Sequence, residues 1–86
     1  MFILRIKRKA LRTVERLDRT KKNVVKEILL LLKTDPVPAK KRDVSKLRGY
    51  DNIYRIRIGN LRIVYQVLWA ERTIIVIYVG PRRKSY

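Results

Sequence analysis

The feature that constrains this chain most is an alternation of apolar and charged side chains on both sides of a short glycine turn. Apolar residues alternate with arginines over residues 54–58, and a period of two returns over residues 61–67. Because successive side chains of a strand point to opposite faces, this pattern predicts two half-buried strands. Gly59 and Asn60 lie between them, and glycine at the first loop position favours a type II′ hairpin.

The arginines of this hairpin are predicted to share one face of the sheet. With a two-residue loop, Arg57 lies directly opposite Arg62, and Arg55 lies two residues along the strand. Like charges in opposed positions are destabilising. Two interpretations are open: a solvated basic face, or a platform for phosphate, whose oxygens the arginine fork binds in bidentate fashion.

The rest of the chain predicts two helices and two further strands. Residues 2–6 alternate as a short strand, and residues 8–17 carry apolar side chains at the three- and four-residue spacing of an amphipathic helix. Asp18 or Thr20 can cap a second helix with a broader apolar face. That helix is expected to end before Pro36, because the residue ahead of a proline is pushed out of the helical region.

Together these segments predict one domain over residues 1–86, of the α+β class. We expect two N-terminal helices packed on one face of a small, mainly antiparallel four-stranded sheet. Residues 34–45 are predicted as a connector without a strand, and residues 73–79, apolar on both faces, as an interior strand.

The charge balance narrows the functions open to such a domain. The chain has 23 Lys and Arg against 7 Asp and Glu, a formal charge of +16, and neither Cys nor His. This composition excludes histidine triads, thiol nucleophiles and zinc sites of the usual ligands, and no cofactor or metal is expected. A compact chain with this charge favours a polyanionic or acidic partner. The apolar run at residues 74–79 is far below the ~20 residues of a membrane span, so no membrane partner is expected.

Two more basic clusters flank the hairpin strands. One follows the last strand and consists of Arg82, Arg83 and Lys84, with Tyr86 at the end of the sequence. Cations with a nearby aromatic ring are typical of single-stranded RNA recognition, although basic tails also serve solubility. The other cluster is residues 46–50, which on their own say little about function.

Three segments, KLRGY, YRIRIGNLRIVYQV and IYVGPRRKSY, follow a two-helix start in this order. In this arrangement the chain resembles the RelE branch of the RelE/ParE toxin superfamily, most strongly over residues 46–86. The resemblance implies a cytoplasmic toxin that cleaves mRNA in the ribosomal A site. It also implies two kinds of partner: the ribosome with its mRNA and rRNA, and a cognate acidic, RelB-like antitoxin that holds the toxin inactive.

The resemblance also implies a catalytic set of basic residues and a tyrosine. Matched position by position, this set consists of Arg55, Arg57, Arg62, Arg82 and Tyr86. The neighbouring basic residues are expected to bind RNA, and these are Lys46, Arg48, Arg83 and Lys84.

Such a site suits RNA cleavage without a metal, because the 2′-hydroxyl of the RNA is itself the nucleophile. Arg57, Arg62 and Arg82 are expected to stabilise the negative charge that develops on the phosphate. Well-known members of the family carry lysines at the positions of Arg55 and Arg57, and arginine cannot exchange a proton as lysine can. The general base therefore stays open, with Tyr86 as the leading candidate.

Two other functions remain open at this stage. A ParE-like poison of DNA gyrase shares the fold, and a non-catalytic basic nucleic-acid-binding protein shares the charge. The cations of the helical half are either a solvated surface or a docking surface for rRNA, and these are Lys7, Lys9, Arg12, Arg16, Lys21, Lys22 and Lys26.

Overall fold

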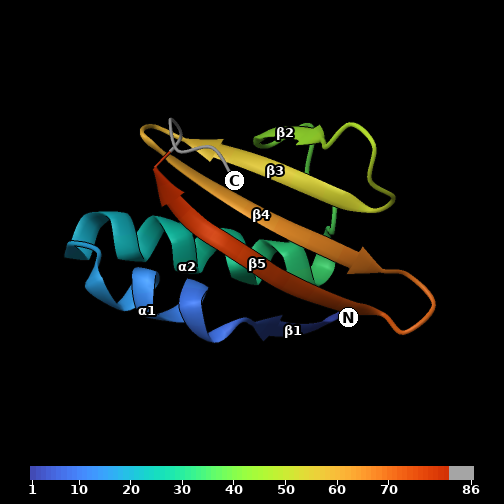
Figure 1. The fold of residues 1–86 in the computed structure, drawn as a ribbon, viewed down its shortest axis with the longest axis horizontal. Coiled ribbons are helices and arrows are strands. Elements are labelled where there is room, and N and C mark those ends of the chain that lie inside the picture. The colour runs from blue at the N-terminus through green and yellow to red at the C-terminus, as the bar shows by residue number, and fades with distance from the viewer. Residues whose placement is uncertain (82–86) are drawn as a thin grey trace.

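The structure is a computed structural model that describes residues 1–81. Two helices cover one face of a five-stranded sheet (Figure 1), and the other face, which no helix of residues 1–81 covers, is called the open face below. The strand order is β1-β5-β4-β3-β2; β1 runs parallel to β5, and the other neighbours are antiparallel. The elements in chain order are β1 (Ile3–Ile6), α1 (Arg8–Arg16), α2 (Arg19–Thr34), β2 (Asp43–Lys46), β3 (Ile53–Ile58), β4 (Leu61–Leu68) and β5 (Thr73–Pro81).

Both helices form where the apolar spacing predicts them. Asp18 caps α2, because its carboxylate accepts a hydrogen bond of 2.9 Å from the backbone N–H of Lys21. The helix ends at Thr34, ahead of Asp35 and Pro36, as the proline rule requires. The broader apolar face of α2 is the more buried of the two and contributes Val25, Ile28, Leu29 and Leu32 to the core.

The β3–β4 hairpin has the predicted register. Ile58 pairs with Leu61 around a two-residue loop, and Gly59 has a φ of 53° while Asn60 has no positive φ. These signs are those of a type II′ turn. The helix-covered face of the hairpin is the core of the molecule and includes the fully buried Ile56, Ile63 and Tyr65.

The prediction of a four-stranded sheet was wrong by one strand. The end of the predicted connector forms β2, in which Asp43 pairs with Arg57 and Ser45 with Arg55. One apolar residue, Val44, packs against the core from this strand. A segment of four residues with a single apolar side chain carries no recognisable alternation, and its strand conformation comes from pairing with β3.

A buried tyrosine ties the connector to the sheet. The Tyr65 hydroxyl donates a hydrogen bond of 2.7 Å to the carbonyl of Pro36, and its ring stacks on Tyr54 with centroids 5.8 Å apart. Burial raises the pKa of the Tyr65 phenol, and the neighbouring Tyr54 and Asp35 act in the same direction. The ionised form of Tyr65 is therefore disfavoured in the folded protein.

Neither helix within residues 1–81 has the length and hydropathy of a membrane span.

Candidate functional site

Strand register brings three arginines together on the open face of the sheet. Arg57 of β3 lies opposite Arg62 of β4, as predicted, and Arg62 lies opposite Gly80 of β5 on its other side. One row further along, Arg55 lies between Ser45 of β2 and a residue of β4. The apolar partners of the same strands face the helices, so the arginines project away from them.

The three arginines have different surroundings. Arg57 is exposed, whereas Arg55 is half-buried and its Nη2 donates a hydrogen bond of 3.0 Å to the Ser45 hydroxyl. The Nε of Arg55 is buried and meets no acceptor within residues 1–81. Arg62 is only 8% exposed. One guanidinium is thus open to solvent, and two are held close to the sheet.

Tyr78 is a member of this site that the sequence did not single out. Its ring lies over Gly80, where an added Cβ would collide with the Tyr78 hydroxyl and lie 2.7 Å from the ring carbon Cζ. The Cζ of Arg62 is 6.0 Å from the centre of the same ring, within the range of a cation–π contact. Glycine at position 80 therefore makes room for an aromatic ring beside Arg62. Positions 78 and 80 are two residues apart in β5 and therefore share one face of the sheet.

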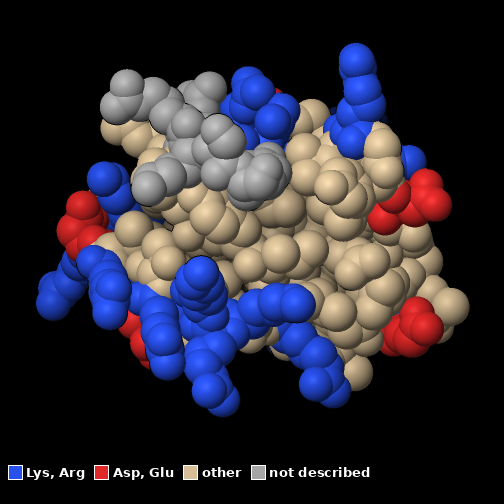
Figure 2. Space-filling model, viewed as in Figure 1, with Lys and Arg blue, Asp and Glu red and all other residues tan. Residues whose placement is uncertain are grey.

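Neither Arg55 nor Arg57 forms an ion pair with a carboxylate of residues 1–81. Asp43 lies directly across from Arg57, yet it forms no ion pair with any of residues 1–81. In that part of the chain the one ion pair joins Arg42 to Glu27 at 3.9 Å. On the face shown in Figure 2, Lys and Arg gather along the lower edge over α1 and β1, and others lie near the upper edge.

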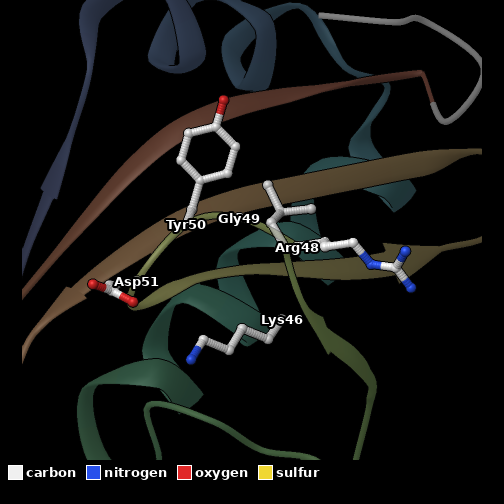
Figure 3. A pocket seen from close by; sticks show the side chains of 6 residues that line it. Lys46, Arg48, Gly49, Tyr50 and Asp51 are labelled. Atoms are coloured by element: carbon white, nitrogen blue, oxygen red, sulfur yellow. The ribbon is translucent and has the colours of Figure 1, made fainter.

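The β2–β3 loop separates the two RNA-binding candidates that it carries. Lys46 pairs with Tyr54 and therefore belongs to the helix-covered side of the sheet, not to the arginine face. Arg48 is exposed in the loop, and its side chain points away from that of Lys46 (Figure 3). Both line an open hollow of about 560 Å³ with Leu47, Gly49, Tyr50 and Asp51.

Comparison with known proteins assigns the chain to a family. The family model described as the ParE toxin of the type II toxin-antitoxin system parDE matches residues 4–86. The chain belongs to this toxin family. It is 36% identical to RelE1 of Methanocaldococcus jannaschii over 85 residues, which are 99% of this chain and 94% of the relative. The predicted membership of the RelE/ParE superfamily is thus confirmed.

Solved structures agree with the assignment to the RelE/ParE toxins. The RelE-RelB complex of the archaeon Pyrococcus horikoshii OT3 contains a chain with a TM-score of 0.87 and 28% identity, and 98% of each chain is covered. The isolated RelE toxin of E. coli has a TM-score of 0.82 and 28% identity, covering 99% of this chain and 88% of that one. This family member is therefore a RelE-type toxin of a toxin–antitoxin system.

The remaining predicted site residues of this RelE-type toxin lie outside the described part of the chain. They are Arg82, Arg83, Lys84 and Tyr86. Their predicted roles in catalysis and RNA binding stay predictions. Within residues 1–81 there is no group of three or more His, Cys, Asp or Glu side chains that could hold a metal ion.

Proposed function

We propose that this toxin is a ribosome-dependent endoribonuclease that cleaves mRNA in the ribosomal A site and thereby stops translation in the cytoplasm. The observation that carries the proposal is the group of Arg55, Arg57 and Arg62 on the open sheet face, with Tyr78 beside it. Such a surface is complementary to a phosphodiester, and guanidinium groups bind phosphate oxygens with defined geometry.

The chemistry uses a nucleophile that the substrate itself supplies. The 2′-hydroxyl loses its proton and attacks the adjacent phosphorus, forming a 2′,3′-cyclic phosphate while the bond to the 5′-oxygen breaks and that oxygen takes up a proton. Arg57 and Arg62 stabilise the negative charge that builds up on the phosphate, which is often the largest single contribution to such catalysis. The reaction requires no metal or cofactor, because no separate nucleophile has to be generated.

The other members of the site have distinct tasks in this scheme. Arg55, held by Ser45, binds phosphate or tunes the local charge, because an arginine does not exchange protons at physiological pH. Arg82 adds a further cation, and Tyr86 acts as the general base or stacks on a base of the codon. Arg48 binds the RNA backbone next to the site.

Two partners follow from this function. The first is the ribosome with its mRNA and rRNA, which presents a single-stranded message to the open sheet face. The second is an acidic, RelB-like antitoxin; related chains have been solved as RelE-RelB complexes. A formal charge of +16 favours both partners, since each offers negative charge.

The test is cleavage of a defined message on translating ribosomes, with the new RNA ends mapped. We expect cuts within A-site codons for the wild type and a loss of roughly 10²-fold or more in rate for Arg57→Gln, because one preorganised charge is removed. An exposed cation of the connector, such as Lys40, provides the matched control when changed to Gln. Intact message would contradict the endoribonuclease proposal, and efficient, specific cutting of naked RNA at physiological salt would contradict its ribosome dependence.

A ParE-like gyrase poison is the second candidate, favoured by the ParE description of the matching family model. A supercoiling assay with purified DNA gyrase separates the two, because a gyrase poison would inhibit supercoiling and leave the message intact. A non-catalytic nucleic-acid-binding protein would do neither, and Arg62→Ala and Arg82→Ala would weaken its binding only slightly.

A further inference from the structure

The β2–β3 loop exposes an aromatic ring that the fold does not use. Tyr50 is 60% exposed, and contact of its aromatic ring with water contributes little to the stability of the fold. Its neighbour Gly49 has a φ of 84°, a conformation that glycine adopts without strain. Inside the loop, the Leu47 N–H donates a 2.8 Å hydrogen bond to the Ile53 carbonyl. The loop is therefore closed at its base, and Tyr50 lies at its tip.

The far end of the loop is held by β4. Asn52 has a φ of 62°, and its backbone carbonyl accepts a 2.8 Å hydrogen bond from the N–H of Val67. The side-chain oxygen of Asn52 accepts a second bond, of 3.2 Å, from the indole N–H of Trp69. An aromatic ring on a loop fixed in this way is preorganised, so a ligand that contacts it does not have to order the loop.

The hollow lined by Tyr50 is open and also carries two cations, Lys46 and Arg48, and one carboxylate, Asp51. The ring of Tyr50 stands apart from the other labelled side chains of the hollow and extends over the sheet, while Arg48 extends in the direction in which β3 runs (Figure 3). That direction leads toward the hairpin that carries Arg57 and Arg62. Apart from Leu47, the remaining lining residues are polar, charged or glycine, so the hollow offers no apolar groove to a protein helix.

We propose that Tyr50 is a stacking site for one base of single-stranded RNA, with Arg48 on an adjoining phosphate. An exposed ring beside cations is the arrangement that recognises unstacked bases, because every base has a π-face and every linkage a charge. The inference rests on the proposed function, since the same message would extend from the arginine group along the open face to this loop.

The spacing along β3 fixes what Tyr50 can do. From Ile53 to Arg57 the strand advances four residues, or about 13 Å at ~3.3 Å per residue. Tyr50, which lies beyond Ile53, therefore contacts a nucleotide away from the cleaved linkage. It is a binding residue and not a catalytic one, so its loss should raise KM on ribosomes and leave kcat close to that of the wild type.

The experiment measures the binding of a fluorescently labelled single-stranded hexaribonucleotide by anisotropy, with isolated protein. Tyr50→Ala should weaken binding roughly 10-fold or more, the size of a lost base–aromatic stack. Tyr50→Phe should bind as the wild type does. Leu30→Ala is the matched control, because Leu30 is 65% exposed on α2 and its loss removes a similar exposed apolar side chain.

A second series identifies stacking as the cause. The hexaribonucleotide is prepared with an abasic site at each position in turn, and wild type and Tyr50→Ala are compared on each. At one position the difference between the two proteins should vanish, because the base that stacks on the ring is gone. The abasic series on the wild type alone should show weakened binding at that same position, so this result does not depend on how the variant folds.

Several outcomes would overturn the inference. Equal RNA binding by wild type and Tyr50→Ala would do so, as would a Tyr50→Phe variant as weak as Tyr50→Ala, or a difference that persists at every abasic position. Loss of binding to an acidic antitoxin peptide with unchanged RNA binding would assign the loop to a protein partner instead. A wild type that binds RNA through Tyr50 but cuts no message would count against the proposed function and not against this site.

Discussion

Arg57 and Arg62 face each other across the β3–β4 hairpin, one pair away from the Ile58–Leu61 pair that closes the turn. The closing pair of a two-residue hairpin is hydrogen bonded, so the arginines form the next, non-hydrogen-bonded pair. In such pairs the Cα atoms lie about 4.5 Å apart and the side chains are close. Both arginines experience this repulsion, but their surroundings differ. Arg57 is exposed, whereas Arg62 is only 8% exposed and its Cζ lies 6.0 Å from the centre of the Tyr78 ring.

Substitution of Arg57, the exposed arginine of this pair, should lower activity without lowering stability. In Arg57→Gln the cross-strand repulsion disappears and no buried contact is lost, so the free energy of unfolding should be unchanged or higher by at most ~1 kcal/mol. Thermal melting, run beside Lys46→Gln, which removes one charge from the other side of the sheet, measures the effect. A melting temperature well below that of the wild type would mean that Arg57 has a stabilising role in the fold.

The buried member should behave differently. Arg62→Gln relieves the same repulsion but loses the contact with Tyr78, which at a desolvated site is worth up to about 2 kcal/mol. We expect Arg62→Gln to melt below Arg57→Gln and to lose message cleavage as completely. If Arg62→Gln were as stable as Arg57→Gln, the aromatic contact would contribute nothing to stability.

The hairpin could be predicted from the sequence because its register has few alternatives. A two-residue loop leaves one pairing, and a slip by one residue would turn every arginine into the core. β2 could not be predicted in this way, because Asp43, Ser45 and Lys46 are polar and only Val44 reaches the core. Its conformation depends on contact with β3, which a local pattern does not contain.

The arginine pair could be predicted, but its aromatic neighbour could not. Val76 is buried in the core, and simple alternation from it would place Tyr78 in the core as well. The register shifts between Val64, which pairs with Tyr78, and Tyr65, which pairs with Val76, so Ile77 is an extra residue in β5. This bulge turns Tyr78 to the arginine face, and a bulge inside an evenly apolar strand leaves no mark in the sequence.

A methyl group at position 80 should act through Tyr78. In Gly80→Ala the new Cβ collides with the Tyr78 ring, so the ring has to leave its place beside Arg62. We expect lower cleavage in Gly80→Ala, measured on translating ribosomes. In a Tyr78→Ala background the same change should have little further effect, because the ring that it displaces is absent. Additive losses in the double variant would mean that Gly80 acts independently of Tyr78.

Binding of RNA by the isolated protein should depend steeply on salt. Each neutralised phosphate of a single strand contributes about −0.7 to the slope of log K against log salt concentration. Arg57→Gln should reduce the magnitude of this slope by about 0.7 if the exposed guanidinium contacts one phosphate. A slope equal to that of the wild type would place the bound RNA away from the hairpin.

Tyr65 should give the protein a specific sensitivity to alkaline pH. Burial raises the pKa of its phenol above that of the unfolded chain, which ionises near pH 10. Above pH ~10 the unfolded state therefore holds fewer protons than the folded state, and the free energy of unfolding falls as pH rises. Below pH ~10 this contribution is fully present.

Tyr65→Phe isolates the effect, because lysines titrate alike in both proteins and cancel in the difference. At pH 8 the variant should be less stable by about 1 kcal/mol, since it loses the hydrogen bond to Pro36. As pH rises above ~10, the unfolded wild type loses the Tyr65 proton while the folded wild type keeps it. The stability advantage of the wild type over Tyr65→Phe should therefore shrink and then reverse. Denaturant unfolding of both proteins from pH 8 to pH 11 measures this difference. A constant difference across that range would show that Tyr65 ionises as easily in the fold as in the unfolded chain.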